Sequence, residues 1–151
     1  MPGRLIGIAR KDRPRGAVEL LDRAAIGVET GIAGDFRGAV RPGRSNRRQI
    51  TIMAAEDWSA ALAELGQPVS WECRRANLLS EGVELPRLPG VRLRIGGALV
   101  EITGECDPCS RMEEVAVGLK AALTPAWRGG RTARVIEGGL IALGAIIEVE
   151  T

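Results

Sequence analysis

Short apolar runs, separated by glycine-rich polar segments, dominate the first third of the chain. Leu5 to Ala9 predicts a strand, and Ala17 to Leu21 and Arg23 to Val28 predict two further extended segments beyond a charged loop. From Gln49 to Ile52, apolar and polar side chains alternate, which is the period of a strand with one buried face. The N-terminal region is therefore expected to be built from short strands.

Two segments change to the helical period. Apolar side chains recur at helical spacing from about Ala55 to Leu65, and Gly66 follows where a helix commonly ends. A second helix is predicted from about Arg111 to Leu123, and Ser110 and Glu113 form a capping-box pattern at its start. The apolar positions that define the two helices are Trp58, Ala61, Leu62 and Leu65 in the first and Met112, Val115, Ala116 and Leu119 in the second.

Ser70 to Leu79 is expected to be extended and to carry polar side chains in its middle. Because adjacent residues on a strand face opposite sides, Arg75 and Asn77 share one face and Arg74 points to the other. Two long polar side chains on one face are typical of a pocket wall or of an exposed edge strand. The sequence pattern leaves both interpretations open.

The C-terminal half predicts more strands. Val91 to Ile95 and Leu99 to Thr103, joined by Gly96-Gly97, form a hairpin pattern that leads directly into a cysteine-containing turn. Short strands, glycine-rich turns and only two convincing helices favour a mainly β fold, a closed or nearly closed antiparallel barrel, over a βαβ sheet. The last expected strands are Thr132 to Ile136, Leu140 to Ile141 and Ala145 to Val149.

The composition fits one globular domain. The chain has 151 residues, the size of an ordinary domain, and we expect a single domain over residues 1–151. Its 45% apolar content excludes a disordered chain, and its 3% aromatic content means that the core must consist of Val, Ile, Leu and Ala.

Charge points to arginine chemistry without indicating a polyanionic partner. The formal net charge of +2 is too small to argue for nucleic-acid or membrane binding. Lys11 and Lys120 are the only lysines, and five arginines lie in the polar loop between Gly31 and Arg48. That loop is either an anion cradle, since guanidinium groups bind phosphate and carboxylate in forked geometry, or a solvated mobile loop. Codon bias explains the arginine excess equally well.

The residues that are missing exclude several catalytic classes. With no histidine in the sequence, a Ser-His-Asp triad, a Cys-His pair and any histidine-ligated metal site are excluded. The odd number of cysteines, Cys73, Cys106 and Cys109, is typical of a reducing compartment. No stretch resembles a signal peptide or reaches membrane-spanning length. We therefore expect a soluble cytoplasmic protein.

The turn Cys106-Asp107-Pro108-Cys109 is the first candidate for chemistry. A thioredoxin-like redox centre is disfavoured because the preceding hairpin is not a βαβ context, and a zinc site lacks ligands. Two inert cysteines in a turn are the remaining alternative. Cys109 precedes the expected helix cap, where positive partial charge favours the thiolate, so a single activated thiolate at Cys109 fits best. Cys106 becomes an accessory thiol that could resolve an oxidised Cys109.

The order of short motifs along nearly the whole chain resembles that of a known family. These motifs are Gly34-Asp35, Arg47-Arg48-Gln49, Arg75-x-Asn77, Glu81-Gly82-Val83, Leu88-Pro89-Gly90, Cys106-x-Pro108-Cys109, Arg128-Gly129-Gly130 and Glu137-Gly138-Gly139-x-Ile141 with Gly144. Together they resemble the MOSC domain, the module named after the C-terminal part of molybdenum cofactor sulfurase and found also as stand-alone bacterial proteins. The resemblance implies a MOSC-type β-barrel with about two to three peripheral α-helices.

The resemblance also implies a ligand, the pterin-based molybdenum cofactor (molybdopterin). The family's invariant cysteine falls on Cys109, which is a molybdenum ligand in some relatives and a sulfur-handling residue in others. The Arg-x-Asn element falls on Arg75 and Asn77, which are expected to hold the pterin and its phosphate. Further cofactor contacts are expected from Arg47, Arg48 and Asp107, the last beside the cysteine. Pyridoxal phosphate binding is a family-level term only.

Departures from the family pattern leave the activity open. Where many relatives carry a histidine close to the Gly-Asp element, this chain has Asp35-Phe36-Arg37. The extra domains of larger relatives are not expected. A second subunit, as in a homodimer, would then be needed to cover the cofactor. The expected function is molybdenum-cofactor binding with Cys109 as metal ligand or sulfur carrier, with reduction of N-hydroxylated compounds if the protein is an enzyme. The alternatives are a non-catalytic carrier that delivers cofactor or sulfur to a partner enzyme, and a degenerate scaffold that binds another anion. The expected partners are an electron-donor protein or a cofactor-acceptor protein.

Overall fold

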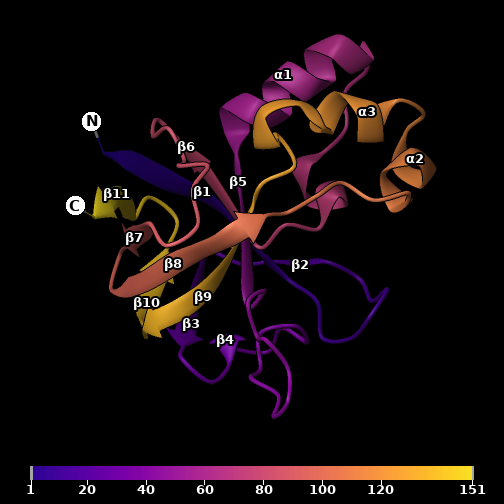
Figure 1. The fold of residues 1–151 in the computed structure, drawn as a ribbon. Coiled ribbons are helices and arrows are strands. Elements are labelled where there is room, and N and C mark those ends of the chain that lie inside the picture. Colours follow the sequence, from indigo (N-terminus) through magenta and orange to yellow (C-terminus); the bar gives the residue numbers. More distant parts are fainter. Residues whose placement is uncertain (1, 151) are drawn as a thin grey trace.

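Seven strands close into a barrel in the computed structural model, which describes residues 2–150 (Figure 1). The barrel closes because β1 pairs with β11 as well as with β6. Its strands, in the order in which they neighbour one another, are β11 (Ile146–Glu150), β7 (Arg92–Ile95), β8 (Ala98–Glu105), β9 (Arg131–Glu137), β5 (Ile50–Ala54), β6 (Leu78–Glu81) and β1 (Gly3–Arg10). The mainly β barrel predicted from the sequence is confirmed.

Four short strands lie beside the barrel. β2 (Glu19–Leu20) pairs with the end of β1. A three-stranded sheet consists of β10 (Gly139–Ala142), β3 (Arg23–Gly27) and β4 (Gly31–Ile32), with β3 in the middle. The Gly96–Gly97 turn of the β7–β8 hairpin contacts this sheet, because the Gly97 N–H donates to the Leu140 carbonyl at 3.1 Å.

Aliphatic side chains fill the barrel, as the low aromatic content predicts. Ala98, Val100 and Ile102 of β8 alternate inward and are at most 1% exposed. Ile50 and Ile52 of β5 do the same, and both are fully buried. Because a closed barrel leaves no free sheet edge, each of these strands is fixed in register by both of its neighbours.

The three α-helices gather at one end of the barrel (Figure 1). They are α1 (Ala55–Leu65), α2 (Arg111–Val115) and α3 (Leu119–Leu123), and two 3₁₀ turns accompany them, η1 (Trp71–Arg74) and η2 (Pro125–Trp127). Trp58, Met112 and Leu119 form a second apolar cluster between the helices and the barrel wall. In residues 2–150 no helix has both the length and the apolar character needed to cross a membrane.

The first helix matches its prediction at both ends. It spans Ala55–Leu65, and Gly66 ends it with a φ of 79°, the left-handed conformation that glycine adopts without strain. The helix also explains a departure from an all-antiparallel barrel. It connects β5 to β6, and these two strands are parallel because a helical crossover joins them instead of a tight turn.

Two predictions for secondary structure, by contrast, are wrong. The segment from Ser70 to Leu79 is not one extended strand, because η1 occupies its first half and Arg75 is left-handed, with a φ of 66°. The expected helix from Arg111 to Leu123 is broken at Gly118, whose φ of 93° starts a second short helix. Both errors arise because periodicity detects apolar faces and not the turns that divide them.

Gln49 joins three parts of the fold. This side chain is 4% exposed and precedes β5. Its Nε2 donates to the Val28 carbonyl at 2.8 Å and to the Gly38 carbonyl at 3.1 Å, and its Oε1 accepts from the Val135 N–H at 2.8 Å. The amide therefore holds the loop that follows β4 against β9, since a buried polar group left without these partners is costly.

Replacing Gln49 by leucine is expected to destabilise the protein. The change preserves size but leaves the Val135 N–H and two carbonyls without partners, which costs about 2–4 kcal/mol and lowers Tm by about 5–15 °C. Thermal unfolding followed by circular dichroism measures this. The matched control is Gln67→Leu, because Gln67 is exposed. Equal Tm values for the two variants would contradict the bridging role of Gln49.

Candidate functional site

A buried arginine fixes the cysteine turn. Arg74, 5% exposed, donates from Nη2 to the Cys106 carbonyl at 3.0 Å and from Nε to the Gly129 carbonyl at 3.2 Å. The same Nη2 lies 3.4 Å from Cys106 Sγ. The turn also packs directly on Gly129, where a Cβ atom would lie 2.7 Å from the Cys106 carbonyl oxygen. Arg74 thus joins η1, the end of β8 and the loop before β9.

The two cysteines of the turn have different environments. Cys106 is 3% exposed and contacts Arg74, whereas Cys109 is exposed to solvent. The predicted capping box is wrong: Ser110 makes no capping hydrogen bond, and Glu113 accepts from the Gly118 and Lys120 N–H groups instead. Because α2 has only five residues, the helix-terminus argument for an activated Cys109 loses its support.

Four of the residues singled out in the sequence line one cavity. We call it the cysteine cavity, and its volume is about 350 Å³. The Thr103 hydroxyl donates to the Arg47 carbonyl and contacts the Thr132 hydroxyl, so the arginine loop is attached to the barrel at this point. The lining residues are Arg47, Arg48, Gly104, Glu105, Cys106, Asp107 and Thr132.

Carboxyl chemistry in this cavity centres on Glu105. Burial, followed by the charge of Asp107 and a hydrogen bond shared with it, raises the pKa of Glu105. Glu105 therefore keeps its proton to a higher pH than an isolated glutamate does.

Arg75 and Asn77 line a small neighbouring pocket with Lys11 and Asp35. Asn77 is 8% exposed, and its amide group is largely occupied by backbone. Its Oδ1 accepts from the Thr51 N–H at 3.0 Å and the Thr51 hydroxyl at 3.2 Å, and its Nδ2 donates to the Ala9 carbonyl at 3.1 Å. Asn77 therefore connects β1 to β5, and one N–H of its amide remains for a ligand.

Lys11 lies at the centre of a group of positive charges. Burial, aided by three neighbouring guanidinium groups, lowers the pKa of the Lys11 amine to about 8. These groups belong to Arg75, Arg37 and Arg111, in order of decreasing effect, and Asp35 opposes them. The Lys11 ammonium also lies 5.2 Å from the centre of the Phe36 ring. We call Lys11, Arg37, Arg75 and Arg111 the cationic cluster.

Arg37 connects the cationic cluster to the cysteine cavity. Burial, followed by the charge of Arg48, lowers its pKa, and Cys106 and Asp35 act in the opposite direction. Asp35 fixes the backbone here, because its carboxylate accepts from the Lys11 N–H at 3.0 Å and the Arg37 N–H at 3.3 Å. Buried Asp35 is thus committed to backbone and only partly offsets the surrounding positive charge.

In the described part of the chain, the cationic cluster forms no ion pairs with carboxylates. The ion pairs found among residues 2–150 involve other arginines, such as Arg10 with Glu19 at 2.8 Å and Arg128 with Glu64 at 2.8 Å. None of them includes a member of the cationic cluster. Like charges held together without counter-charges are unfavourable in the free protein, so the cluster can stabilise a bound anion.

Sequence reasoning missed three members of this cluster, Lys11, Arg37 and Arg111. Arg111 follows Cys109 by two residues, and Arg37 follows the Gly-Asp motif, so both lie in stretches that the sequence had marked. Lys11 carries no motif. The signal available for it was the rarity of lysine in an arginine-rich chain.

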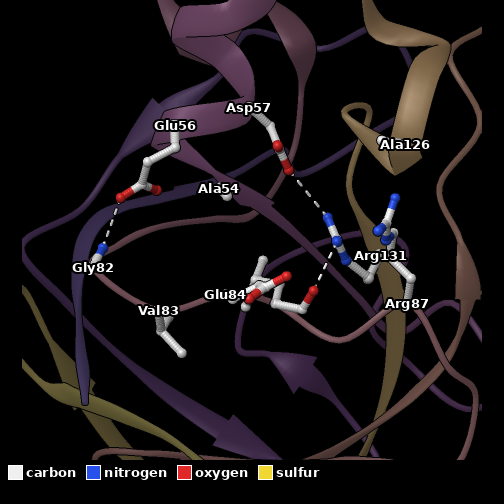
Figure 2. Close-up of a pocket in the computed structure, with 10 residues that line it drawn as sticks. Ala54, Glu56, Asp57, Gly82, Val83, Glu84, Arg87, Ala126 and Arg131 are labelled. Atoms are coloured by element: carbon white, nitrogen blue, oxygen red, sulfur yellow. Dashed lines mark hydrogen bonds and ion pairs between the residues drawn. The ribbon is translucent and has the colours of Figure 1, made fainter. Parts of the chain in front are cut away.

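A second large cavity is lined by other residues (Figure 2). Its volume is about 400 Å³, and Glu56, Asp57, Arg87 and Arg131 contribute polar side chains. Arg131 is already occupied: it donates to the Asp57 carboxylate at 3.3 Å and to the carbonyls of Leu85 and Pro86 at 2.8 and 3.1 Å. None of the site residues predicted from the sequence lines this cavity.

Comparisons with known proteins agree with the fold. The MOSC domain family matches residues 39–148. The structure is similar to that of the YuaD protein from Bacillus subtilis, with 24% sequence identity and a TM-score of 0.82 over 99% of this chain and 96% of that one. It is also similar to YiiM from Geobacillus stearothermophilus, with 18% identity and a TM-score of 0.73 over 99% of this chain and 76% of that one.

A third similar structure is that of YiiM from Escherichia coli, with 16% identity and a TM-score of 0.70 over 98% of this chain and 70% of that one. No curated protein sequence matches the chain significantly. At these identities the solved structures establish the fold of the barrel and its helices.

The Lys11 amine is expected to titrate near pH 8 in the ligand-free protein and at higher pH when phosphate is bound, because an anion stabilises the ammonium form. Methylation of lysine with ¹³C, followed by NMR, measures both values, since Lys11 and Lys120 are the two lysines. Arg37→Gln removes a neighbouring charge and should also raise the value. A Lys11 signal unaffected by phosphate would contradict an anion site here.

The lowered pKa of Lys11 makes the stability of the protein depend on pH. Because the native pKa of Lys11 is about 8 and its ordinary value is 10.5, the native state binds fewer protons than the unfolded state between these pH values. The contribution of Lys11 to stability therefore increases as pH rises through this range. Lys11→Met is expected to stabilise the protein at pH 7, with the gain shrinking towards pH 10, as measured by urea unfolding.

Arg74→Leu is expected to destabilise the protein by about 2–4 kcal/mol, because hydrogen bonds from a charged donor to two buried carbonyls are lost. In the native protein a thiol reagent should modify Cys109 rapidly and Cys106 slowly, and the variant should expose Cys106. Urea unfolding and thiol-labelling kinetics measure the two effects. Arg92→Gln, at an exposed position, is the control. An equally small effect of both changes would contradict the role of Arg74 in fixing the cysteine turn.

Proposed function

Because the chain belongs to the MOSC domain family, we propose that it binds the molybdenum cofactor, with the Cys109 thiolate as molybdenum ligand. The observation that carries the proposal is the cationic cluster, whose members form no ion pair with a carboxylate of residues 2–150 and lie close to the cysteine turn. A phosphate-bearing pterin supplies the anion that such a cluster lacks.

The donor set of the site fits the cofactor. A thiolate is a soft ligand suited to a metal such as molybdenum, and Cys109 is exposed, so its sulfur is accessible. Arg111, two residues further on, brings positive charge to the same segment.

The roles of the other predicted residues follow from their contacts. Arg75 binds the cofactor phosphate together with Lys11, and Asn77 uses its remaining amide N–H to orient the pterin. Arg47 and Arg48 line the cysteine cavity and bind polar groups of the cofactor or of its substrate. Asp107, on the turn between the two cysteines, restricts access and helps to raise the pKa of Glu105.

The reaction that fits this site is reduction of an N-hydroxylated compound. An N-hydroxylated amine, two electrons and two protons give the amine and water. When bound, the cofactor supplies two-electron redox chemistry at its metal, and a flavin- or iron–sulfur-containing partner protein supplies the electrons. The chain itself would ligate the metal, orient the cofactor and provide protons. Glu105, whose pKa is raised, is the candidate proton donor in the cysteine cavity.

The exposure of Cys109 also favours a second candidate function, a carrier. An exposed thiol can pass sulfur or cofactor to a partner enzyme directly, whereas a catalytic metal is usually shielded from solvent. In this case Cys109 carries sulfur as a persulfide or holds the cofactor until transfer.

Protein produced in a cofactor-competent host is expected to contain molybdenum and pterin, and Cys109→Ser is expected to lose most of the molybdenum. Elemental analysis and pterin fluorescence of the purified proteins measure this. The matched control is Cys73→Ser, because Cys73 lies on η1 outside the cysteine turn. Wild-type protein without molybdenum and pterin would refute the proposal.

Activity separates the enzyme from the carrier. If the protein is an enzyme, the loaded form reduces a hydroxylamine with an artificial electron donor, and Cys109→Ser abolishes the reaction. If it is a carrier, the loaded form shows no such activity but transfers cofactor or sulfur to an acceptor apoenzyme.

A further inference from the structure

A second arginine-rich cavity adjoins the cysteine cavity and is not needed to bind one cofactor phosphate. Its volume is about 400 Å³, and we call it the arginine cavity. It shares Arg47 and Arg48 with the cysteine cavity, so the two cavities are neighbours. Its lining residues are Pro14, Phe36, Arg37, Ala39, Arg41, Arg44, Ser45, Asn46, Arg47 and Arg48.

The loop that builds this cavity has a defined conformation. The Asn46 carboxamide accepts from the Arg41 N–H at 2.9 Å and donates to the Arg41 and Arg44 carbonyls, each at 3.0 Å. Asn46 itself is left-handed, with a φ of 54°. Further bonds hold the ends of the loop, from the Val40 N–H to the Glu29 carbonyl at 2.8 Å and from the Thr103 hydroxyl to the Arg47 carbonyl. The guanidinium groups therefore project from a fixed turn.

The charge of the cavity is not compensated. None of the ion pairs found in the described part of the chain includes any of its five arginines, Arg37, Arg41, Arg44, Arg47 and Arg48. Five unpaired cations exceed what a single carboxylate neutralises, whereas a phosphate monoester carries nearly two negative charges and three acceptor oxygens.

The size of the cavity favours a small molecule. A volume of about 400 Å³ lies in the range of small-ligand pockets, and Phe36 and Pro14 add apolar surface beside the arginines. An anion held here lies next to the cysteine cavity, because Arg47 and Arg48 form the wall between the two.

We propose that the arginine cavity binds a phosphate group of the substrate, so that the protein acts on phosphate-bearing small molecules whose reactive group extends past the cysteine cavity towards Cys109. This inference rests on the proposed function for the reaction, but the binding of phosphate does not depend on molybdenum. It gives a role to Arg41 and Arg44, which lie outside the cofactor contacts assigned above.

The first test measures binding of adenosine 5′-monophosphate, with adenosine as the uncharged probe, by isothermal titration calorimetry. The nucleotide is expected to bind the cofactor-free protein at least tenfold more tightly than adenosine. The double variant Arg41→Gln, Arg44→Gln is expected to weaken nucleotide binding at least tenfold. The charge-matched control, Arg23→Gln with Arg87→Gln, removes two arginines outside the cavity and should bind normally. Equal binding by both double variants would overturn the inference.

Two further arms separate this subsite from the cofactor site. Arg75→Gln is expected to weaken molybdenum retention and leave nucleotide binding intact, and the molybdenum-loaded protein should bind the nucleotide as well as the cofactor-free protein does. If loading abolished nucleotide binding, the cavity would belong to the cofactor and the inference would be wrong. If nucleotide bound normally but no molybdenum were ever found, the proposed function would fail and the phosphate subsite would stand.

Discussion

The hydrogen bonds of the buried Arg74 guanidinium hold the candidate site together. They connect η1, the end of β8 and the loop before β9, three segments that are distant in sequence. Burying a guanidinium is costly unless its hydrogen bonds are made, and here the carbonyls of Cys106 and Gly129 and the Cys106 sulfur supply partners. Because Gly129 has no Cβ atom, the cysteine turn can pack directly against it. The position of Cys109 depends on this arrangement.

Around this turn the protein keeps positive charges together without matching carboxylates. Such an arrangement is unfavourable in the free protein, and after burial, the largest cause, it contributes to the lowered pKa of Lys11. An anion that enters the cluster relieves the repulsion, so part of its binding free energy comes from a cost already present in the fold. The same holds for the arginine cavity, where Asn46 fixes the loop and thereby reduces the entropy lost on binding.

The strands were predictable because a barrel with an aliphatic core imposes a strict alternation on them. The hairpin from Val91 to Thr103 and the first helix, Ala55–Leu65 with its Gly66 terminus, were found where the sequence placed them. The second helix was not, because its apolar spacing continues across Gly118 although the backbone does not. The capping box failed for a related reason. Because the chain turns at Gly118, the Glu113 carboxylate accepts from the Gly118 N–H and does not cap the helix that follows Ser110.

For the site, the sequence by itself determined the chemistry available, a pair of thiols in one turn, an excess of arginine and no histidine. It also singled out Arg47, Arg48, Cys106 and Asp107, which share a cavity because they lie where strands end and loops meet. Only the tertiary structure decided which cations act together. Lys11, Arg37, Arg75 and Arg111 come from four separate segments, and their proximity depends on the pairing of β1 with β6 and on the contacts of Asp35, which no local pattern encodes.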